Sequence, residues 1–265
     1  MTTIHDAYIN ALLADASYVD GLRNATLETQ LTGCMTPELA KYIADNFTVV
    51  TQVGGLASSF DATVWRDNSG QIYVSMRGTQ ELADFFADGD LATSGLAHEQ
   101  LADMVNWWLR ATTTGQAAQI AVRTIIIPGP DPVTVQDFVA APSVQGTGEL
   151  ASISAIKSVN GHSLGGYLAS AFVRLFGAQW PVEAINTFNS AGFSRLATAN
   201  IEDGFNQIAQ IVGPALGLGG FSDAQNNYFG ENGINVTTNT WDPIGFQSIR
   251  HPHRAVSGRL GPTGY

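Results

Sequence analysis

The chain has 265 residues, of which 45% are hydrophobic and 13% charged, so it can bury a large core in one α/β domain or two small ones. We expect a single domain over residues 1–265. The formal net charge of −11 argues against nucleic acid and against an anionic membrane surface as partners, because both would repel the chain. A neutral substrate fits this charge better.

Features that would indicate export, a disulfide or a metal site are weak. No stretch reaches the length of a membrane span, and the start "MTTIHDAYIN" lacks a Sec-type signal peptide, so we expect secretion by another route or a cytoplasmic location. The single Cys34 cannot form an internal disulfide. Asp84, Asp88 and Asp90 lie close together but lack the spacing and glycine of an EF-hand loop, so we interpret them as solvated or capping residues. We expect no metal and no cofactor.

Two helices are predicted near the start of the chain. The second opens at Thr36-Pro37-Glu38 and runs through "ELAKYIADNF", with Pro37 in its first turn. Both helices belong to an N-terminal helical layer that we expect over residues 1–46. The first helix spans residues 4–19 and is expected to place the following side chains largely on one face: Ile4, Ala7, Tyr8, Ala11, Leu12, Ala16 and Tyr18.

The hydrophobic period then changes to two, which is typical of strands. The segments "FTVVTQV", "FDATVWRD" and "QIYVSMRG" predict three strands, with a turn at "DNSGQ" between the last two. Residues 96–114 predict a helix that carries Leu101, Met104 and Trp108 on one face. We favour a helix that faces the core, and the alternative is that residues 92–112 include a mobile lid whose apolar surface comes from Trp107 and Trp108.

Strands and helices alternate in the second half of the chain. Residues 120–150 are interpreted as an excursion from the sheet rather than a linker. After them, "AIKSVN", "VEAINTFN" and "INVTTNTW" predict strands, and "LGGYLASAFVRLFGA" predicts a helix. Strands followed by helices indicate an α/β fold with a mostly parallel central sheet covered by helices.

The segment "NGHSLGG" contains Ser163 in a Gly-x-Ser-x-Gly motif. The motif alone is weak, but here a predicted strand leads in, a predicted helix leads out, and Gly161 and Gly165 flank the serine. That context is the nucleophile elbow, which exposes a serine above the sheet edge and points a helix N-terminus at the reacting carbonyl. The alternative interpretation is a glycine-rich helix start capped by Ser163.

Four segments in this order resemble the bacterial relatives of the fungal-type (class 3) lipases, which are α/β hydrolases. The resemblance spans roughly residues 73–245 and implies an α/β-hydrolase fold and ester hydrolysis. It does not include the helix-rich start or residues 112–150. The segments are "YVSMRGTQELADFFADGDL", "VNGHSLGGYLASAF", "INTFNSAGF" and "VTTNTWDPIG".

The resemblance also implies roles for individual residues. Thr79, after a strand that ends in Arg-Gly, matches the residue that contributes its N–H to the oxyanion hole, and Leu164 contributes the other N–H. The alternative for Thr79 is an ordinary turn residue. Asp242 in "WDPIG" matches the acid of the triad, against an Asp-Pro turn as its alternative. Asp203 is a weaker rival because "IEDG" is interpreted as a solvated loop.

The base is the least determined member of the triad. His5 and His98 precede the central strands, which is the wrong chain order, and we expect His162 to point away from the nucleophile across the elbow. His253 and His251 both follow Asp242, at a shorter separation than family members usually have. We favour His253, since His251 precedes Pro252 and is biased toward extended backbone. A base beyond this chain is the third alternative.

These inferences predict a serine carboxylic-ester hydrolase that acts on a small-molecule or lipid ester through an acyl-enzyme, with a transient lipid interface and no nucleic-acid partner. Within this class we rank a lipase first, then phospholipase A1, then polyester hydrolase. A non-catalytic or truncated hydrolase-like binding module is the alternative from another class. The oligomeric state is not indicated by the sequence.

Overall fold

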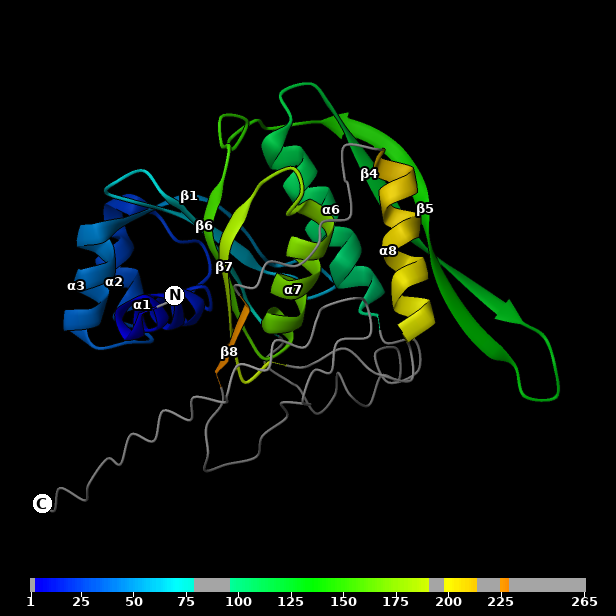
Figure 1. Ribbon diagram of the computed structural model, residues 1–265, viewed down its shortest axis with the longest axis horizontal. Coiled ribbons are helices and arrows are strands. Elements are labelled where there is room, and N and C mark those ends of the chain that lie inside the picture. Colours follow the sequence, from blue (N-terminus) through cyan, green and yellow to red (C-terminus); the bar gives the residue numbers. More distant parts are fainter. Residues whose placement is uncertain (1–2, 79–95, 191–197, 214–224, 229–265) are drawn as a thin grey trace, which may run out of the picture.

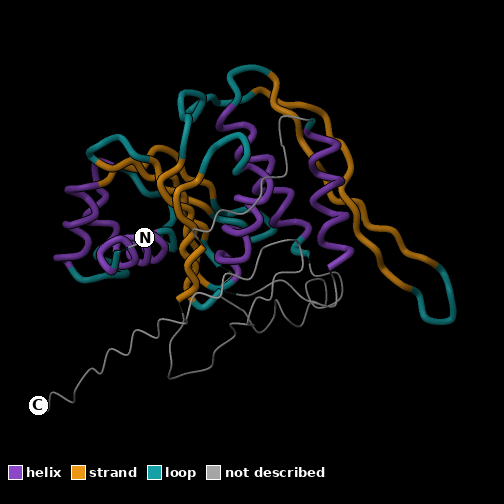
Figure 2. Tube along the Cα trace, in the orientation of Figure 1, coloured by secondary structure: helices purple, strands orange, loops and turns teal. Residues whose placement is uncertain are grey.

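A six-stranded sheet runs through the molecule, and helices cover both of its faces (Figures 1 and 2). The computed structural model describes residues 3–78, 96–190, 198–213 and 225–228. The order β1-β2-β3-β6-β7-β8 places antiparallel pairs at the β1 edge and parallel pairs from β3 to β8. The strands of this sheet are β1 (Phe47–Val53), β2 (Ala62–Asp67), β3 (Ile72–Met76), β6 (Ile156–His162), β7 (Val182–Phe188) and β8 (Gln225–Tyr228).

The N-terminal helices pack on one face of the sheet (Figure 1). Thr3 begins the first helix with a reciprocal capping box to Asp6, and Thr36 caps the third with Pro37 in its first turn. Both predicted helices are therefore confirmed, and two short segments between them were not predicted. The elements are α1 (Ile4–Ala16), the 3-10 helix η1 (Asn24–Thr26), α2 (Leu27–Leu31) and α3 (Pro37–Asn46).

The buried face of α1 differs from the predicted one. Ile4 and Tyr8 were expected in the apolar face, yet they are 77% and 51% exposed. Leu12 and Ala16 of the predicted face do contact the core, together with Leu13, which was not predicted there. Hydrophobic residues lie on more than one side of α1, so periodicity alone does not identify the side that meets the sheet.

The opposite face of the sheet is covered by α6 (His98–Thr112) and α7 (Leu164–Phe176) (Figure 1). Trp108 of α6 is fully buried, and its ring packs edge-on against Phe172 with 4.6 Å between ring centroids. Because α6 is fixed in the core in this way, the interpretation of residues 96–112 as a lid is wrong, and the core-facing helix is confirmed. Residues 92–95 of the lid hypothesis lie outside the described residues.

The excursion predicted over residues 120–150 is a long antiparallel hairpin of β4 (Gln116–Ile127) and β5 (Val133–Gln145). Ile120 and Phe138 are buried in the main core, and α8 (Thr198–Val212) packs against the ribbon. The far end of the hairpin extends well away from the sheet (Figure 1). Across the described residues, none of the helices is long and apolar enough to cross a membrane.

Two predictions about the last third of the chain have different outcomes. Asp203, expected in a solvated loop, is exposed but lies within α8, so the loop assignment is wrong. The predicted strand "INVTTNTW" lies outside the described residues. Neither α8 nor β8 was predicted. β8 has only four polar-rich residues, and it pairs with β7. α8 has 15 residues and buries Ile201, Phe205 and Ile208 at helical spacing, a signal that the interpretation of "IEDG" as a loop overlooked.

Candidate active site

The backbone makes a strained turn between β6 and α7, at Ser163. This residue has φ 59° and ψ −124°, a region that costs a non-glycine residue on the order of 1–3 kcal/mol. The Ser163 N–H donates to the carbonyl of Phe188 in β7 at 3.0 Å, and the Ser163 carbonyl accepts from the N–H of Gly166 at 3.0 Å. The strand–turn–helix context predicted for Ser163 is therefore confirmed, with the turn tied to the neighbouring strand.

Two glycines allow this turn because no side chain fits at their positions. A Cβ on Gly161 would lie 2.1 Å from the carbonyl oxygen of Gly165. A Cβ on Gly165 would lie 2.1 Å from the carbonyl oxygen of Met76, at the end of β3. Both obstacles are backbone atoms, which cannot rotate away as a flexible side chain can. The glycines of the motif are thus required by the close approach of β3, β6 and α7.

The Ser163 side chain is buried, with 1% of the residue exposed. Its hydroxyl has no hydrogen-bond partner among the described residues, which is uncommon for a buried polar group. The next residue, Leu164, is the first residue of α7, so its N–H has no acceptor within the helix and lies at the positive end of the helix dipole. A hydroxyl without a partner among the described residues, beside an N–H without an acceptor in its own helix, is an arrangement suited to a nucleophile and an oxyanion donor.

The end of β3 brings a second loop to the same place. Met76 pairs with Gly161 in the parallel register, so β3 and β6 end together. Two residues later, a Cβ on Gly78 would lie 2.6 Å from the carbonyl oxygen of His162 and 3.1 Å from the backbone nitrogen of Leu164. Gly78 therefore touches the elbow backbone directly. Thr79, the predicted oxyanion residue, follows Gly78 and lies outside the described residues.

Tyr18, from the N-terminal layer, joins the two loops. Its hydroxyl accepts from the N–H of Gly78 at 3.3 Å and lies 3.1 Å from Nδ1 of His162. Burial lowers the pKa of His162 below 6.5, which favours a neutral ring whose Nδ1 accepts from the Tyr18 hydroxyl. His162 thus bonds toward the N-terminal layer, as expected of a side chain that alternates with Ser163.

Arg77 fixes Tyr18 from the other side. Its guanidinium lies 5.3 Å from the Tyr18 ring centroid and pairs with Asp20 at 2.9 Å and Asp61 at 3.3 Å. Burial raises the pKa of Asp61, and the Arg77 charge opposes that rise. Sequence reasoning assigned Tyr18 only to a helical face, because nothing in a local motif indicates a contact between residues separated by 60 and 144 positions.

The carboxyl ends of the four parallel strands meet at this edge. Tyr228, the last residue of β8, stacks on Phe188 of β7 with 5.2 Å between ring centroids. Phe188 is the residue whose carbonyl binds Ser163, so the described chain ends next to the elbow. Asp242, His251 and His253 follow along the chain and lie outside the described residues. Of the five predicted site residues, Ser163 and Leu164, which are neighbours in the sequence, lie within the described residues.

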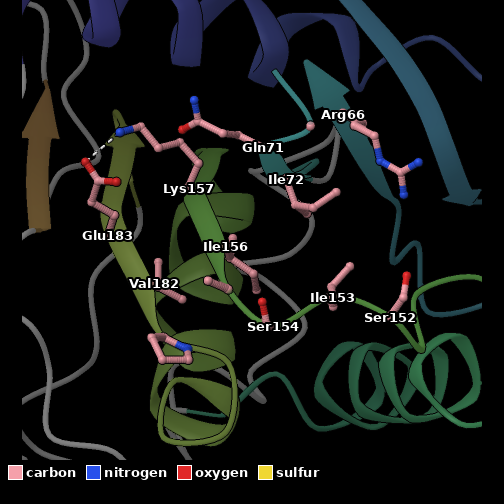
Figure 3. A pocket seen from close by; sticks show the side chains of 13 residues that line it. Arg66, Gln71, Ile72, Ser152, Ile153, Ser154, Ile156, Lys157, Val182 and Glu183 are labelled. Atoms are coloured by element: carbon pink, nitrogen blue, oxygen red, sulfur yellow. Dashed lines mark hydrogen bonds and ion pairs between the residues drawn. The ribbon is translucent and has the colours of Figure 1, made fainter. Parts of the chain in front are cut away.

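A surface hollow of about 720 Å³ lies at the other end of the sheet (Figure 3). Its lining includes Ile72, Ile156 and Val182, at the amino ends of β3, β6 and β7, and a Lys157–Glu183 ion pair of 2.5 Å crosses its rim. Ligands of open α/β sheets bind at the carboxyl ends of the strands. The hollow is therefore separate from the candidate site at Ser163. Within the described residues, no group of three His, Cys, Asp or Glu side chains could hold a metal ion.

The mixed sheet, the helices on both faces and the serine on a strained turn between strand and helix define an α/β-hydrolase-like fold. Solved structures with a similar chain trace include a lipase from Rhizopus microsporus var. chinensis, with 14% identity and a TM-score of 0.36. A triacylglycerol lipase with a serine-protease triad has 13% identity and a TM-score of 0.35. A deletion mutant of Rhizomucor miehei lipase in its propeptide complex has 14% identity and a TM-score of 0.33.

These similarities are too low to assign an activity. The matches cover 77% of this chain in each case and 64%, 69% and 57% of the three lipases, so the chain spans less than two thirds of the first of them. No protein-family model matches the chain. No curated protein matches it either.

Proposed function

We propose that the chain is a serine carboxylic-ester hydrolase that cleaves lipid acyl esters, with Ser163 as the nucleophile. The observation that carries this proposal is the Ser163 turn: a strained backbone, a buried hydroxyl without a partner among the described residues, and a helix N-terminus at the next residue. A serine that only capped a helix would accept a hydrogen bond from the first turn, and Ser163 makes no such bond to α7.

In the proposed reaction the Ser163 Oγ attacks the ester carbonyl carbon while its proton passes to an imidazole, assigned to His253 with His251 as the alternative. Asp242 orients that imidazole. The carbonyl oxygen becomes an oxyanion that accepts from the N–H groups of Leu164 and Thr79. The C–O bond to the alcohol then breaks, the alcohol takes the proton from the imidazole, and water releases the acid from the acyl-enzyme.

The support for acyl esters over other carbonyl substrates is the resemblance of four sequence segments to class 3 lipases, together with the net charge of −11, which favours a substrate without negative charge. An acylglycerol ranks first as the substrate on these grounds. Phospholipase A1 and polyester hydrolase activities are the further candidates.

Alanine substitution tests the proposal with p-nitrophenyl esters. Ser163→Ala is expected to lose at least about 10³-fold in kcat, because only the oxyanion donors and binding remain. Ser152→Ala is the matched control, since Ser152 lines the hollow at the opposite end of the sheet. Retention of more than about a tenth of the activity in folded Ser163→Ala would contradict the assignment.

The same assay identifies the base. Loss of activity in His253→Ala but not in His251→Ala supports the proposed triad, and loss only in His251→Ala reassigns the base. An inactive parent protein would favour the alternative of a hydrolase-like binding module.

A further inference from the structure

Among the described strands, the large hydrophobic side chains with the highest exposed fractions lie at the far end of the β4–β5 hairpin. Ile126 and Ile127 are 67% and 52% exposed, and Val133 across the ribbon from Ile127 is 55% exposed. Ile125 and its partner Val135 are each 40% exposed. Side chains alternate between faces along a strand, so Ile125 and Ile127 with their partners Val135 and Val133 make one face of the ribbon apolar, and Ile126, opposite Thr134, is exposed on the other face. We call residues 125–135 the hairpin tip.

The apolar character of the hairpin tip stops at one level on both faces. On the face of Ile125 and Ile127, the next pair toward the root is Arg123 with Asp137, joined by an ion pair. On the face of Ile126, the next pair is Thr124 with Gln136. These two polar pairs are adjacent along the ribbon. The boundary between exposed hydrophobic and polar residues therefore lies at the same height on both faces, to within one residue, or about 3.4 Å.

A boundary between hydrophobic and polar residues at the same height on both faces fits a planar partner that the hairpin tip enters end-on. A protein partner would cover one face or one edge of the ribbon, and the opposite face would gain nothing from being apolar. The exposed isoleucines occupy three consecutive positions of β4, and Val133 and Val135 flank Thr134 opposite them on β5, so the tip strands are about 10 Å deep. Apolar faces of interfacial elements enter the boundary between lipid headgroups and acyl chains by about 5–10 Å.

The connecting turn also fits a medium poor in water. It contains Pro128, Pro130 and Pro132, which carry no backbone N–H and so leave fewer donors to desolvate. Proline also restricts the unfolded chain, so ordering the turn costs less entropy. Asp131 is the single charged residue of the hairpin tip, and insertion requires that its carboxylate reach back to the headgroups or take up a proton, because an unpaired charge in the acyl region is costly.

We propose that the hairpin tip inserts into a lipid surface without net charge. The Arg123–Asp137 pair then lies at the headgroup level, and the root of the hairpin stays fixed by the buried Ile120 and Phe138. An anionic surface is disfavoured because the chain carries a net charge of −11 and the hairpin tip contributes a carboxylate and no cation. This inference rests on the hairpin alone and does not require that Ser163 be a nucleophile.

Sedimentation with phosphatidylcholine vesicles tests this insertion, and the Ser163→Ala protein is used so that no lipid is hydrolysed. The hairpin variant replaces Ile125, Ile126 and Ile127 by Thr, which keeps the β-branched shape that suits a strand. The control replaces Ile4 and Leu56 by Thr, because both are exposed apolar residues away from the hairpin.

We expect the parent and the control to bind phosphatidylcholine vesicles and the hairpin variant to bind at least about tenfold more weakly. Vesicles with added phosphatidylglycerol are expected to bind the parent less well. Equal binding of parent and hairpin variant, or no binding by the folded parent, would overturn the proposal. So would a dimer, measured by analytical ultracentrifugation, that the hairpin variant loses, because the tip would then belong to a second copy of the chain.

Discussion

Tyr18 connects the N-terminal helices to the two loops of the candidate active site, and its hydroxyl can be removed without changing the shape of the side chain. In Tyr18→Phe, the Gly78 N–H loses its acceptor and His162 Nδ1 loses its donor. A buried polar group left without a partner costs about 1–3 kcal/mol. We therefore expect the free energy of unfolding to fall by about 1–3 kcal/mol, and the ring to stay in place over Arg77.

The effect on catalysis follows from the position of Gly78, where an added Cβ would lie 3.1 Å from the Leu164 nitrogen. If the Gly78 loop shifts, the donors around the ester oxygen move apart, and misplacement by about 1 Å can cost about 10²-fold. We expect kcat for a p-nitrophenyl ester to fall by about tenfold or more with little change in KM, because the lost interaction acts in the transition state.

Urea unfolding and steady-state kinetics measure the two effects, with Tyr8→Phe as the control because Tyr8 is 51% exposed. The reasoning is refuted if Tyr18→Phe matches the control in both measurements. A loss of stability with unchanged kcat would refute the catalytic part alone.

Three further variants test separate parts of the structure. Gly161→Ala should destabilise the protein by about 1–3 kcal/mol or more and abolish ester hydrolysis. Gly115→Ala is the control, because a Cβ there meets nothing within 4 Å, and it should have neither effect. Thermal unfolding and the ester assay measure the two effects. Trp108→Ala should cost about 3–5 kcal/mol in urea unfolding because α6 is a core helix, and a loss under about 1 kcal/mol would contradict that role. Burial lowers the pKa of His162, so in acid the unfolded chain binds a proton that the folded chain does not. The free energy of unfolding should therefore fall as the pH drops from about 7.5 to about 5. His162→Asn should show a smaller fall over the same range.

Much of the fold could be predicted because its signals are local. The alternation in "QIYVSMRG" and the apolar helix after Ser163 predicted β3 and α7, and both are confirmed. The turn at Ser163 was predicted from two flanking glycines, and the structure gives the physical reason: the backbone of β3 and of α7 occupies the space that their side chains would need. The role of Ser163 in catalysis stays a prediction.

Long-range features were not predictable from the same signals. The buried side of α1 depends on its contact with β6, and hydrophobic residues on several sides of that helix conceal it. The hairpin strands β4 and β5 were predicted only as an excursion from the sheet, because "IAVRTIIIPGPDPV" is followed by a stretch rich in Gly, Ser and Thr that gives no clear strand signal. Tyr18 was assigned to a helix face, and its contact with Gly78 arises only when the N-terminal layer packs on the sheet.

The central claim is that Ser163 is an activated nucleophile, and covalent labelling tests it most directly. A fluorophosphonate reacts with a serine whose proton is removed by a positioned base, and a serine without such a base reacts slowly. We predict that the folded protein is labelled within minutes, that mass spectrometry places the adduct on the peptide containing Ser163, and that Ser163→Ala abolishes labelling. A folded protein that remains unlabelled, or an adduct on another serine, would contradict the account.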